Sequence, residues 1–327
     1  MPPLTSFAPG AESPPARALP LRETVACLNC GSAEALPVTA SRVQMADDPE
    51  RFTWQQCRAC GLVYLSPRVS EAAIGRYYED YLPHRGSAAW GRWAPLVDVG
   101  QRGTDKARLK TVQRVLPLGP GRTLLDVGCG RPTFLRLAQR GTGARAIGLD
   151  FDASGWEHDP GEWAGLELHA GVLDDVALSV PPDVITLWHV LEHLYAPVES
   201  LRQLRQLAKP GTRLIIEVPD HAGLTRRLQG SCWAGYHTPR HTAVYTPATL
   251  RAVLERAGWR VERQYQWGTL DPYVLWWLGQ QERRQRSLSG SLESRFLPFL
   301  AGKILSTPIV LAERFVPLGF QTAIATI

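Results

Sequence analysis

The stretch TLLDVGCG at residues 123–130 decides the fold of this 327-residue chain. Its first five residues form a short apolar run interrupted only by Asp126, which predicts a buried β-strand. Gly128 and Gly130 follow, where the strand would turn into a helix expected over residues 132–139. Glycine lets the backbone approach a ligand closely, and a helix N-terminus offers free N–H groups. The stretch therefore predicts a ligand-binding turn after a first strand.

Outward from this turn, apolar runs that predict strands alternate with helical patterns. Strands are expected over residues 123–127, 146–149, 166–169, 184–188, 214–218, 259–267 and 322–327. Helices are expected over residues 132–139, 196–207 and 247–257, and a further helical region over residues 68–116. Such alternation predicts an α/β fold whose parallel sheet is covered by helices on both faces. Glycine and proline break the segment after Asp150, so no full helix is expected there.

Composition and charge narrow the class of protein. Apolar residues make up 44% and charged residues 20% of the chain, a balance that supports a buried core and excludes a fully disordered, collagenous or coiled-coil protein. The net charge of +5 is too small to require a nucleic-acid partner. No uninterrupted apolar run reaches the ~18 residues that a membrane-spanning helix needs. The first 20 residues hold prolines where a secretory signal would be apolar, so a cytoplasmic location is expected.

Two pairs of cysteines near the N-terminus predict a metal site. Two residues separate Cys27 from Cys30 and Cys57 from Cys60, and a glycine follows each pair. Two such knuckles can place four thiolates about 2.3 Å from one zinc ion. Because four thiolates complete the coordination shell, the zinc would be structural and hold no catalytic water. The competing interpretation is four unrelated cysteines.

Asp150 adds a second candidate ligand-binding group, because it ends the second expected strand twenty residues beyond Gly130. A carboxylate at that place can accept hydrogen bonds from two ribose hydroxyls. In a dinucleotide dehydrogenase the turn would carry a third glycine where this chain has Thr133. Asp126 at the start of the turn suits a ligand with a positive centre better than one with a pyrophosphate. These residues favour a ribose-containing ligand with a positive centre over a dinucleotide.

The turn and Asp150 resemble motif I of class I S-adenosylmethionine-dependent methyltransferases. Segments that resemble the family's later motifs follow at residues 171–175, 188–193 and 209–212. The resemblance covers residues 119–268 and the last strand, and it implies a Rossmann-like, seven-stranded methyltransferase sheet. Similarity to a bacterial methyltransferase subfamily with an N-terminal zinc ribbon is carried by residues 60–67, 77–81 and 239–241. The chain departs from the family at Pro132, where the turn usually carries another glycine.

The resemblance implies roles for individual residues. Those expected to contact S-adenosylmethionine are Asp126, Gly128 and Gly130 at its methionine part, Asp150 at its ribose, Leu173 and Asp174 at its adenine, and Trp188 facing the cofactor. Methyl transfer to a hydroxyl requires a base that removes its proton, and histidine has a suitable pKa. The candidate bases, in order, are His193, His241 and His189. The expected reaction is O-methylation of a small molecule or a sugar-containing glycan.

Several alternatives stay open. His189, Glu192 and His193 form the spacing H-x-x-E-H, which on a helix would share one face and could bind a divalent cation; Glu192 could instead orient a histidine. The chain could also be an RNA methyltransferase whose zinc ribbon contacts RNA, or a methyltransferase-fold scaffold without turnover. The ribbon's basic residues are offset by acidic ones, so nucleic acid is not the expected partner.

The expected organisation has five parts. They are a disordered tail over residues 1–22, a zinc ribbon over 23–66, a helical connector over 67–118, a methyltransferase domain over 119–268 and 319–327, and an apolar helical insertion over 269–318. The insertion could cap the substrate cleft or form a homodimer face. Residues 282–318 could alternatively contact a membrane surface, which would place the protein at the inner face of the membrane.

Overall fold

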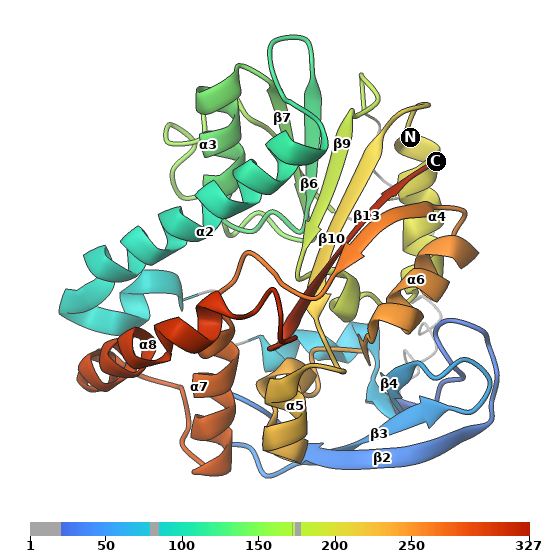
Figure 1. Ribbon diagram of the computed structural model, residues 1–327, viewed down its shortest axis with the longest axis vertical. Helices are drawn as coiled ribbons and strands as arrows, with labels where there is room; N and C mark the ends of the chain where they lie inside the picture. Colours follow the sequence, from blue (N-terminus) through green and yellow to red (C-terminus); the bar gives the residue numbers. More distant parts are fainter. Residues whose placement is uncertain (1–20, 79–84, 172, 174–177) are drawn as a thin grey trace, which may run out of the picture.

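A seven-stranded sheet forms the centre of the protein in the computed structural model, which describes residues 21–78, 85–171, 173 and 178–327 (Figure 1). In chain order its strands are β6 Thr123–Val127, β7 Arg145–Asp150, β8 Glu167–Ala170, β9 Val184–Trp188, β10 Arg213–Pro219, β12 Arg260–Tyr265 and β13 Phe320–Thr326. Their spatial order is β12-β13-β10-β9-β6-β7-β8, and only β13 runs antiparallel to its neighbours. The predicted Rossmann-like α/β sheet is confirmed.

Helices cover both faces of this sheet, as the alternation of elements predicted. One face packs against α2 Ala94–Val115 and α3 Thr133–Thr142, and the other against α4 Pro197–Leu207 and α6 Pro247–Arg256 (Figure 1). Within β6, Leu124 belongs to the cluster with α2 and α3, whereas Leu125 and Val127 belong to the cluster with α4 and α6. Burial on both faces explains why these strands are nearly continuous apolar runs.

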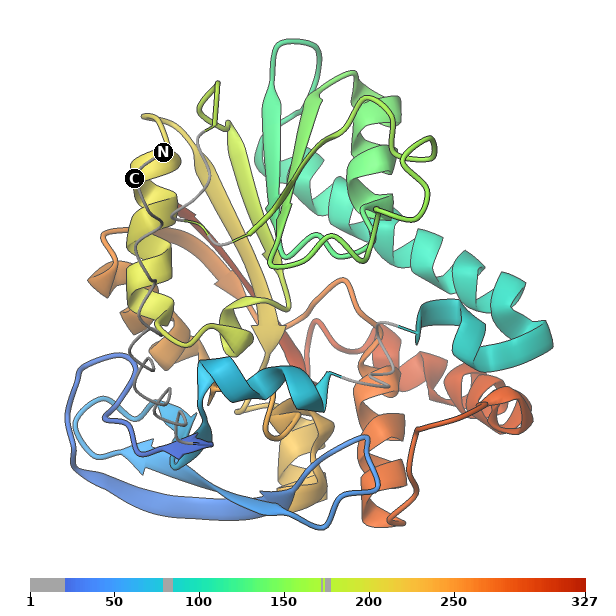
Figure 2. The same cartoon turned by 180° about the vertical axis from the view of Figure 1, so that it is seen from behind.

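A second, four-stranded sheet lies at the carboxyl ends of the parallel strands (Figures 1 and 2). Its order is β11-β4-β3-β2, with β2 Ala35–Arg42, β3 Arg51–Cys57, β4 Val63–Leu65 and β11 Ala243–Val244. Strand β11 comes from the chain between β10 and α6 and pairs antiparallel with β4. The N-terminal strands are therefore hydrogen-bonded to a segment from the part of the sequence that forms the seven-stranded sheet.

The remaining elements are short strands, 3₁₀ helices and the helices near the C-terminus. They are β1 Arg22–Glu23, β5 Arg68–Val69, η1 Glu71–Tyr77, η2 Gly86–Trp93, η4 Leu191–His193, α5 Leu224–Gln229, η5 Gly230–Cys232, η6 Ala234–Tyr236, α7 Pro272–Arg283, η7 Glu293–Arg295 and α8 Phe296–Leu311. Within the described parts of the chain, no helix combines the length and apolar character needed to cross a membrane.

The structure corrects two expectations and confirms one. The helical region expected over residues 68–116 is an α-helix only from Ala94 to Val115 and begins with a strand and 3₁₀ turns. Arg22, expected in the disordered tail, pairs with Val69, and residues 1–20 lie outside the described residues. The segment after Asp150 forms turns without a helix, as its glycines and prolines predicted.

The contact of Trp54 on β3 with Thr238 joins the N-terminal sheet to the segment before β11, and its contribution to the free energy of unfolding can be measured. The Trp54 side chain is fully buried, and its Nε1 donates to the Thr238 hydroxyl at 3.1 Å. Replacing a buried tryptophan by alanine removes a large packed volume, so Trp54→Ala should lower the free energy of unfolding by about 3–5 kcal/mol in urea titrations. The control Leu36→Ala, at an exposed position on β2, should change it by no more than about 0.5 kcal/mol. Equal effects of the two variants would contradict this account.

Candidate functional site

The glycine turn after β6 is fastened to the end of β7. The N–H groups of Gly128 and Cys129 both donate to the carbonyl of Leu149, at 2.7 and 3.1 Å. Gly128 has φ +70° and Gly130 has φ +47°, in the left-handed region that favours glycine. A Cβ at Gly128 would overlap Val190, whereas among the described residues, apart from its two chain neighbours, no atom lies within 4 Å of where a Cβ of residue 130 would stand. The turn is packed on one side and open over Gly130.

Asp150 contacts this turn directly. Its Oδ2 accepts a hydrogen bond from the N–H of Gly130 at 2.7 Å, and its Oδ1 accepts one from the N–H of Phe151 at 2.8 Å. Burial raises the pKa of Asp150, and these two N–H donors offset part of that effect. Two residues that the sequence nominated for one ligand, Gly130 and Asp150, therefore lie together at the carboxyl edge of the sheet.

The chain on either side of the turn packs closely against it. A Cβ at Gly155 would overlap the carbonyl of Gly130, so the turns after β7 lie against the glycine turn itself. Pro132, the departure from the family pattern, stands at the N-cap of α3 with φ −80°. Because proline has no N–H, the start of α3 offers a ligand one donor fewer than another residue would.

Asp126 and Trp188 lie on the side of the sheet edge that faces α2. Asp126 is buried and accepts a hydrogen bond from the Thr186 hydroxyl at 2.6 Å. Burial raises the pKa of Asp126 to about 7, although the charge of Arg108 on α2 acts to lower it. Among the described residues, the buried Nε1 of Trp188 has no hydrogen-bond partner, and its ring meets Phe134 edge to face at 5.8 Å. A buried donor without a partner is a group that a bound ligand can satisfy.

His189 is held between two buried carboxylates. Its Nε2 lies 2.9 Å from Oε1 of Glu217, and its Nδ1 lies 3.5 Å from Oε1 of Glu192. Burial by itself lowers the pKa of His189, but the two carboxylates outweigh burial and raise that pKa to about 9. Burial also acts to raise the pKa of Glu217, yet the hydrogen bond and charge of His189 hold it below its usual range. His189 is therefore protonated at neutral pH.

Glu217 was not identified from the sequence. Its Oε2 accepts from the N–H of Thr269 at 2.7 Å and its Oε1 from the Thr269 hydroxyl at 3.0 Å, so it connects β10, His189 and the chain leading into α7. The sequence signal that could have identified Glu217 was its place inside the apolar run of residues 214–218, because burying an unpaired charge there would cost free energy.

His193, His237 and His241 form a separate group. One ring nitrogen of each lies within 4.8 Å of the others, close enough for a common metal ion. Nδ1 of His193 lies 3.1 Å from the hydroxyl of Tyr78, and Nδ1 of His241 donates to the carbonyl of Gly235 at 2.9 Å. Burial lowers the pKa of all three imidazoles below the usual value. These histidines are neutral at pH 7, in contrast to His189.

The H-x-x-E-H residues do not form the helix that their metal-binding interpretation required. Only Leu191–His193 is helical, as a single 3₁₀ turn, and His189 has φ +61°. Glu192 contacts His189, as the competing interpretation expected, while His193 turns toward His241, with ring centroids 4.5 Å apart. Of the adenine candidates, Leu173 packs against the main hydrophobic cluster, and Asp174 lies outside the described residues.

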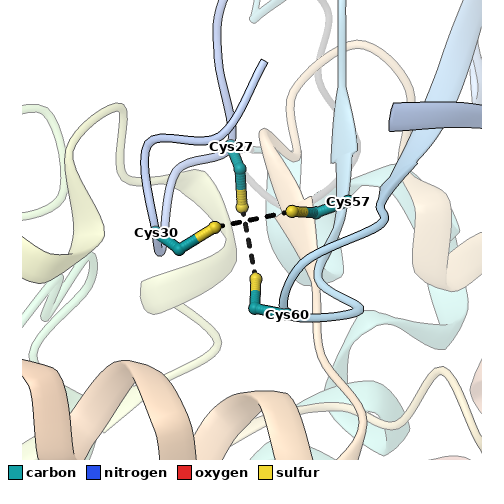
Figure 3. A group of neighbouring side chains, drawn as sticks. All are labelled: Cys27, Cys30, Cys57 and Cys60. Carbon is teal, nitrogen blue, oxygen red and sulfur yellow. Dashed lines mark hydrogen bonds between the residues drawn. The ribbon is translucent and has the colours of Figure 1, made fainter. Parts of the chain in front are cut away.

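The four N-terminal cysteines converge on one point (Figure 3). The sulfur atoms of Cys27 and Cys60 lie 3.4 Å apart, and those of Cys30 and Cys57 lie 3.5 Å apart. Sulfur ligands about 2.3 Å from a tetrahedral zinc ion are about 3.8 Å from one another, so the cluster fits zinc with small adjustments. Burial raises the pKa of the Cys57 thiol, but hydrogen bonds from the N–H of Cys60 and from Cys30 outweigh burial and lower that pKa to about 7.

Comparison with known proteins gives a consistent family. Residues 101–264, half of the chain, match a family model described as a methyltransferase domain. The chain is 27% identical over 154 residues to a probable S-adenosylmethionine-dependent methyltransferase of Mycolicibacterium smegmatis, covering 46% of this chain and 56% of the relative. A tRNA U34 carboxymethyltransferase of Methylococcus capsulatus is 31% identical, covering 46% and 48%, and a ubiquinone biosynthesis O-methyltransferase of Thiobacillus denitrificans is 30% identical, covering 44% and 60%.

These matches concern one part of each protein. The chain spans about half the length of the curated relatives it matches. Among solved structures, that of the [4+2]-cyclase SpnF has a TM-score of 0.52 and 15% identity, covering 80% of this chain and 97% of that protein. This likeness concerns the fold alone.

The charge on His189 predicts a dependence of stability on pH. Its folded pKa of about 9 lies above the value of 6.5 for an ordinary histidine, so its contribution is fully present below pH 6.5 and is lost as pH rises through 9. From this group, the free energy of unfolding should fall by on the order of 3 kcal/mol across that range in urea titrations. NMR should show a protonated His189 imidazole at pH 8. A neutral His189 at pH 8 would contradict the conclusion that Glu192 and Glu217 raise its pKa.

Proposed function

The chain belongs to the class I S-adenosylmethionine-dependent methyltransferase family, and from this premise we propose that it methylates an oxygen atom of a small molecule or a sugar-containing glycan. His193 is the proposed general base. The main support for the proposal is the position of Tyr78, which lies between the Asp150 side of the site and the histidines. Its ring contacts Phe151 beside Asp150, with centroids 6.2 Å apart, and its hydroxyl lies 3.1 Å from Nδ1 of His193.

The residues of the glycine turn fit S-adenosylmethionine. Open space over Gly130 leaves room for its main chain to face the cofactor, and the carboxylate of Asp150 stands where ribose hydroxyls can donate to it. Trp188 offers an Nε1 donor that has no partner within the described parts of the protein. When bound, the cofactor supplies a methyl group on a positively charged sulfur. A positive charge near Asp126, whose pKa is about 7, would favour its ionised form.

His193 suits the role of base because burial keeps it neutral and therefore able to accept a proton. Burial raises the pKa of Tyr78 to about 12, so its hydroxyl stays protonated and can donate to His193 or to the acceptor. His241 is the second candidate, since its Nδ1 is bound to the carbonyl of Gly235 and its Nε2 is the nitrogen left to take a proton. His189 already carries a proton and would act by positioning Glu192 and Glu217.

The enclosure of this site favours transfer to a bound acceptor over reaction with water. Glu192, His237 and His241 are buried, and His193 is enclosed by them and by Tyr78. The proton of the acceptor hydroxyl would move to His193 as its oxygen takes the methyl group. Holding the acceptor hydroxyl beside the base would reduce the entropy cost of the reaction, and the enclosure of the site would exclude water.

The N-terminal sheet would be a zinc ribbon. Each cysteine pair lies on a knuckle closed by a hydrogen bond, from the N–H of Gly31 to the carbonyl of Cys27 and from that of Gly61 to Cys57, both 2.9 Å. Gly31 and Gly61 have φ near +75°, which the tight turns require. Zinc bound by four thiolates would link the chain before β2 to the turn between β3 and β4, and so stabilise a sheet that pairs with β11.

Two variants separate cofactor binding from chemistry. The purified protein is incubated with S-adenosylmethionine carrying a deuterated methyl group and a bacterial polar-metabolite extract, and labelled products are found by mass spectrometry. His193→Gln should leave the calorimetric affinity for S-adenosylmethionine unchanged and lower product formation by about 10²–10⁴-fold, the usual effect of losing a base. Asp150→Asn should weaken cofactor affinity by about 10–100-fold, because an acceptor for ribose hydroxyls loses its charge.

The outcomes distinguish the alternatives. No heat from the wild-type protein with S-adenosylmethionine would favour a scaffold without turnover. Unchanged product formation by His193→Gln would exclude His193 as the base and direct the same test to His241. A label on nitrogen or carbon would overturn O-methylation.

The zinc proposal predicts a metal content. Elemental analysis of the purified protein should find about one zinc per chain, because a single Cys₄ site binds one ion. Cys57→Ser combined with Cys60→Ser should lose the zinc and lower the urea midpoint of unfolding, whereas Cys232→Ser, which changes a cysteine outside the cluster, should do neither. Zinc retained by the double variant would disprove the assignment. A content near two would direct attention to His193, His237 and His241.

A further inference from the structure

The exposed side of α8 is apolar, the reverse of an ordinary surface helix. Its exposed positions are Leu297, Pro298, Ala301, Ile304, Leu305, Thr307, Pro308, Ile309 and Leu311, of which only Thr307 is polar. Leu305 is 80% exposed, and Phe315, just beyond the helix, is 87% exposed. The one lysine of the helix, Lys303, is half-buried and pairs with Asp271 at 3.3 Å. We refer to these exposed apolar residues of α8, with Phe315, as the α8 face.

A basic pocket adjoins the α8 face at its N-terminal end. The pocket holds about 400 Å³ and is lined by Trp277, Gln281, Arg284, Arg286, Ser294, Arg295 and Pro298. Pro298 belongs both to the pocket and to the α8 face, so the two are continuous. The pocket is formed by the C-terminal half of α7, the chain after it, η7 and the first turn of α8, and α7 and α8 contact each other at the edge of the molecule (Figure 1).

The pocket has positive charge that the described residues do not neutralise. No ion pair within those residues joins Arg284, Arg286 or Arg295 to a carboxylate, and Glu293 nearby pairs with Arg92 at 3.2 Å. Burial is the main cause that lowers the pKa of Arg295, and the nearby charge of Arg286 lowers it further. Three guanidinium groups around one cavity suit a phosphate, to which arginine donates in a fork.

A buried side chain in the same pocket lacks a partner. Gln281 is 4% exposed, and its Oε1 makes no hydrogen bond with the described residues. Its Nε2 has only a long contact of 3.4 Å to the carbonyl of Trp277. A buried amide oxygen left unpaired costs free energy, and because it can only accept a hydrogen bond it suits a hydroxyl of a lipid head group beside the phosphate rather than the phosphate oxygens.

We propose that the pocket between α7 and α8 binds the phosphate of an anionic lipid while the α8 face lies in the surface of the membrane. This inference does not rest on the proposed methyl transfer. An interfacial helix buries its apolar side among the acyl chains while basic residues attract anionic head groups. A second copy of the chain fits less well, because a two-fold contact would pair the α8 face with itself, and this face carries no acid that could pair with the arginines of the pocket.

Vesicle flotation with the full chain tests the proposal. The wild-type protein should float with vesicles of phosphatidylcholine mixed with phosphatidylglycerol and float poorly with phosphatidylcholine alone. Arg284→Gln combined with Arg286→Gln should weaken binding to the mixed vesicles on the order of 20-fold, since each basic residue at an anionic surface contributes about 1 kcal/mol. Arg283→Gln, at an exposed arginine outside the pocket, removes one charge and is the control for the single variant Arg284→Gln, than which it should weaken binding much less.

The α8 face and the source of the phosphate are tested separately. Leu305→Ser combined with Ile309→Ser should also abolish flotation, with urea unfolding and affinity for S-adenosylmethionine unchanged. The proposal is overturned if the wild-type protein does not float with mixed vesicles, or if Arg283→Gln weakens binding as much as the pocket variants. Saturable calorimetric binding of inorganic phosphate without flotation would assign the pocket to a soluble phosphate compound. A dimer in light scattering that Leu305→Ser breaks would assign the face to a second copy.

Discussion

The segment from Trp233 to Tyr245 is hydrogen-bonded to both sheets, and the candidate site depends on this double attachment. Strand β11 within it pairs with β4 of the N-terminal sheet, while Tyr245 bridges to Asp220 at the end of β10. Arg240 is buried between them and donates to the carbonyls of Tyr77 and Gln44, at 2.6 and 2.9 Å. Backbone groups that are paired on both sides cannot shift independently. His237 and His241 are thereby held against His193 at the carboxyl edge of the central sheet.

Histidines in this site differ in charge because their neighbours differ. His189 lies between two carboxylates, and its proton compensates charges that would otherwise be costly to bury. His193, His237 and His241 face one another in an equally buried place, where a proton on one ring would repel a proton on the next. Histidine therefore provides a protonated side chain at position 189 and a neutral side chain, able to accept a proton, at position 193. This division is the pattern expected where acid and base roles are separated by environment.

The N-terminal sheet contributes to the site without containing its candidate base. Its β3 residue Trp54 donates to Thr238, and the N–H of Leu65 in β4 donates to the carbonyl of Thr242 at 2.9 Å. If this sheet lost its order, the segment that carries His237 and His241 would lose hydrogen-bond partners. The glycine turn would be disturbed less, because its hydrogen bonds are to β7. The histidines and the glycine turn are therefore held by different parts of the structure, and each can be perturbed separately.

Local sequence was enough to predict the strands of the central sheet, the glycine turn with Asp150, and the two cysteine knuckles. These features depend on periodicity, on glycine's access to positive φ, and on residue spacing, all of which act over a few neighbours. The contact between Gly130 and Asp150 followed from the rule that parallel strands bring their carboxyl ends to one edge. Tertiary structure alone decided the partners of each histidine, the role of Glu217, the pairing of β11 with β4, and the outward apolar side of α8. The contacts of His189 with Glu217 and of Arg240 with Gln44 join residues 28 and 196 positions apart, and the burial and charge that set the pKa of a buried group exist only after the chain has folded.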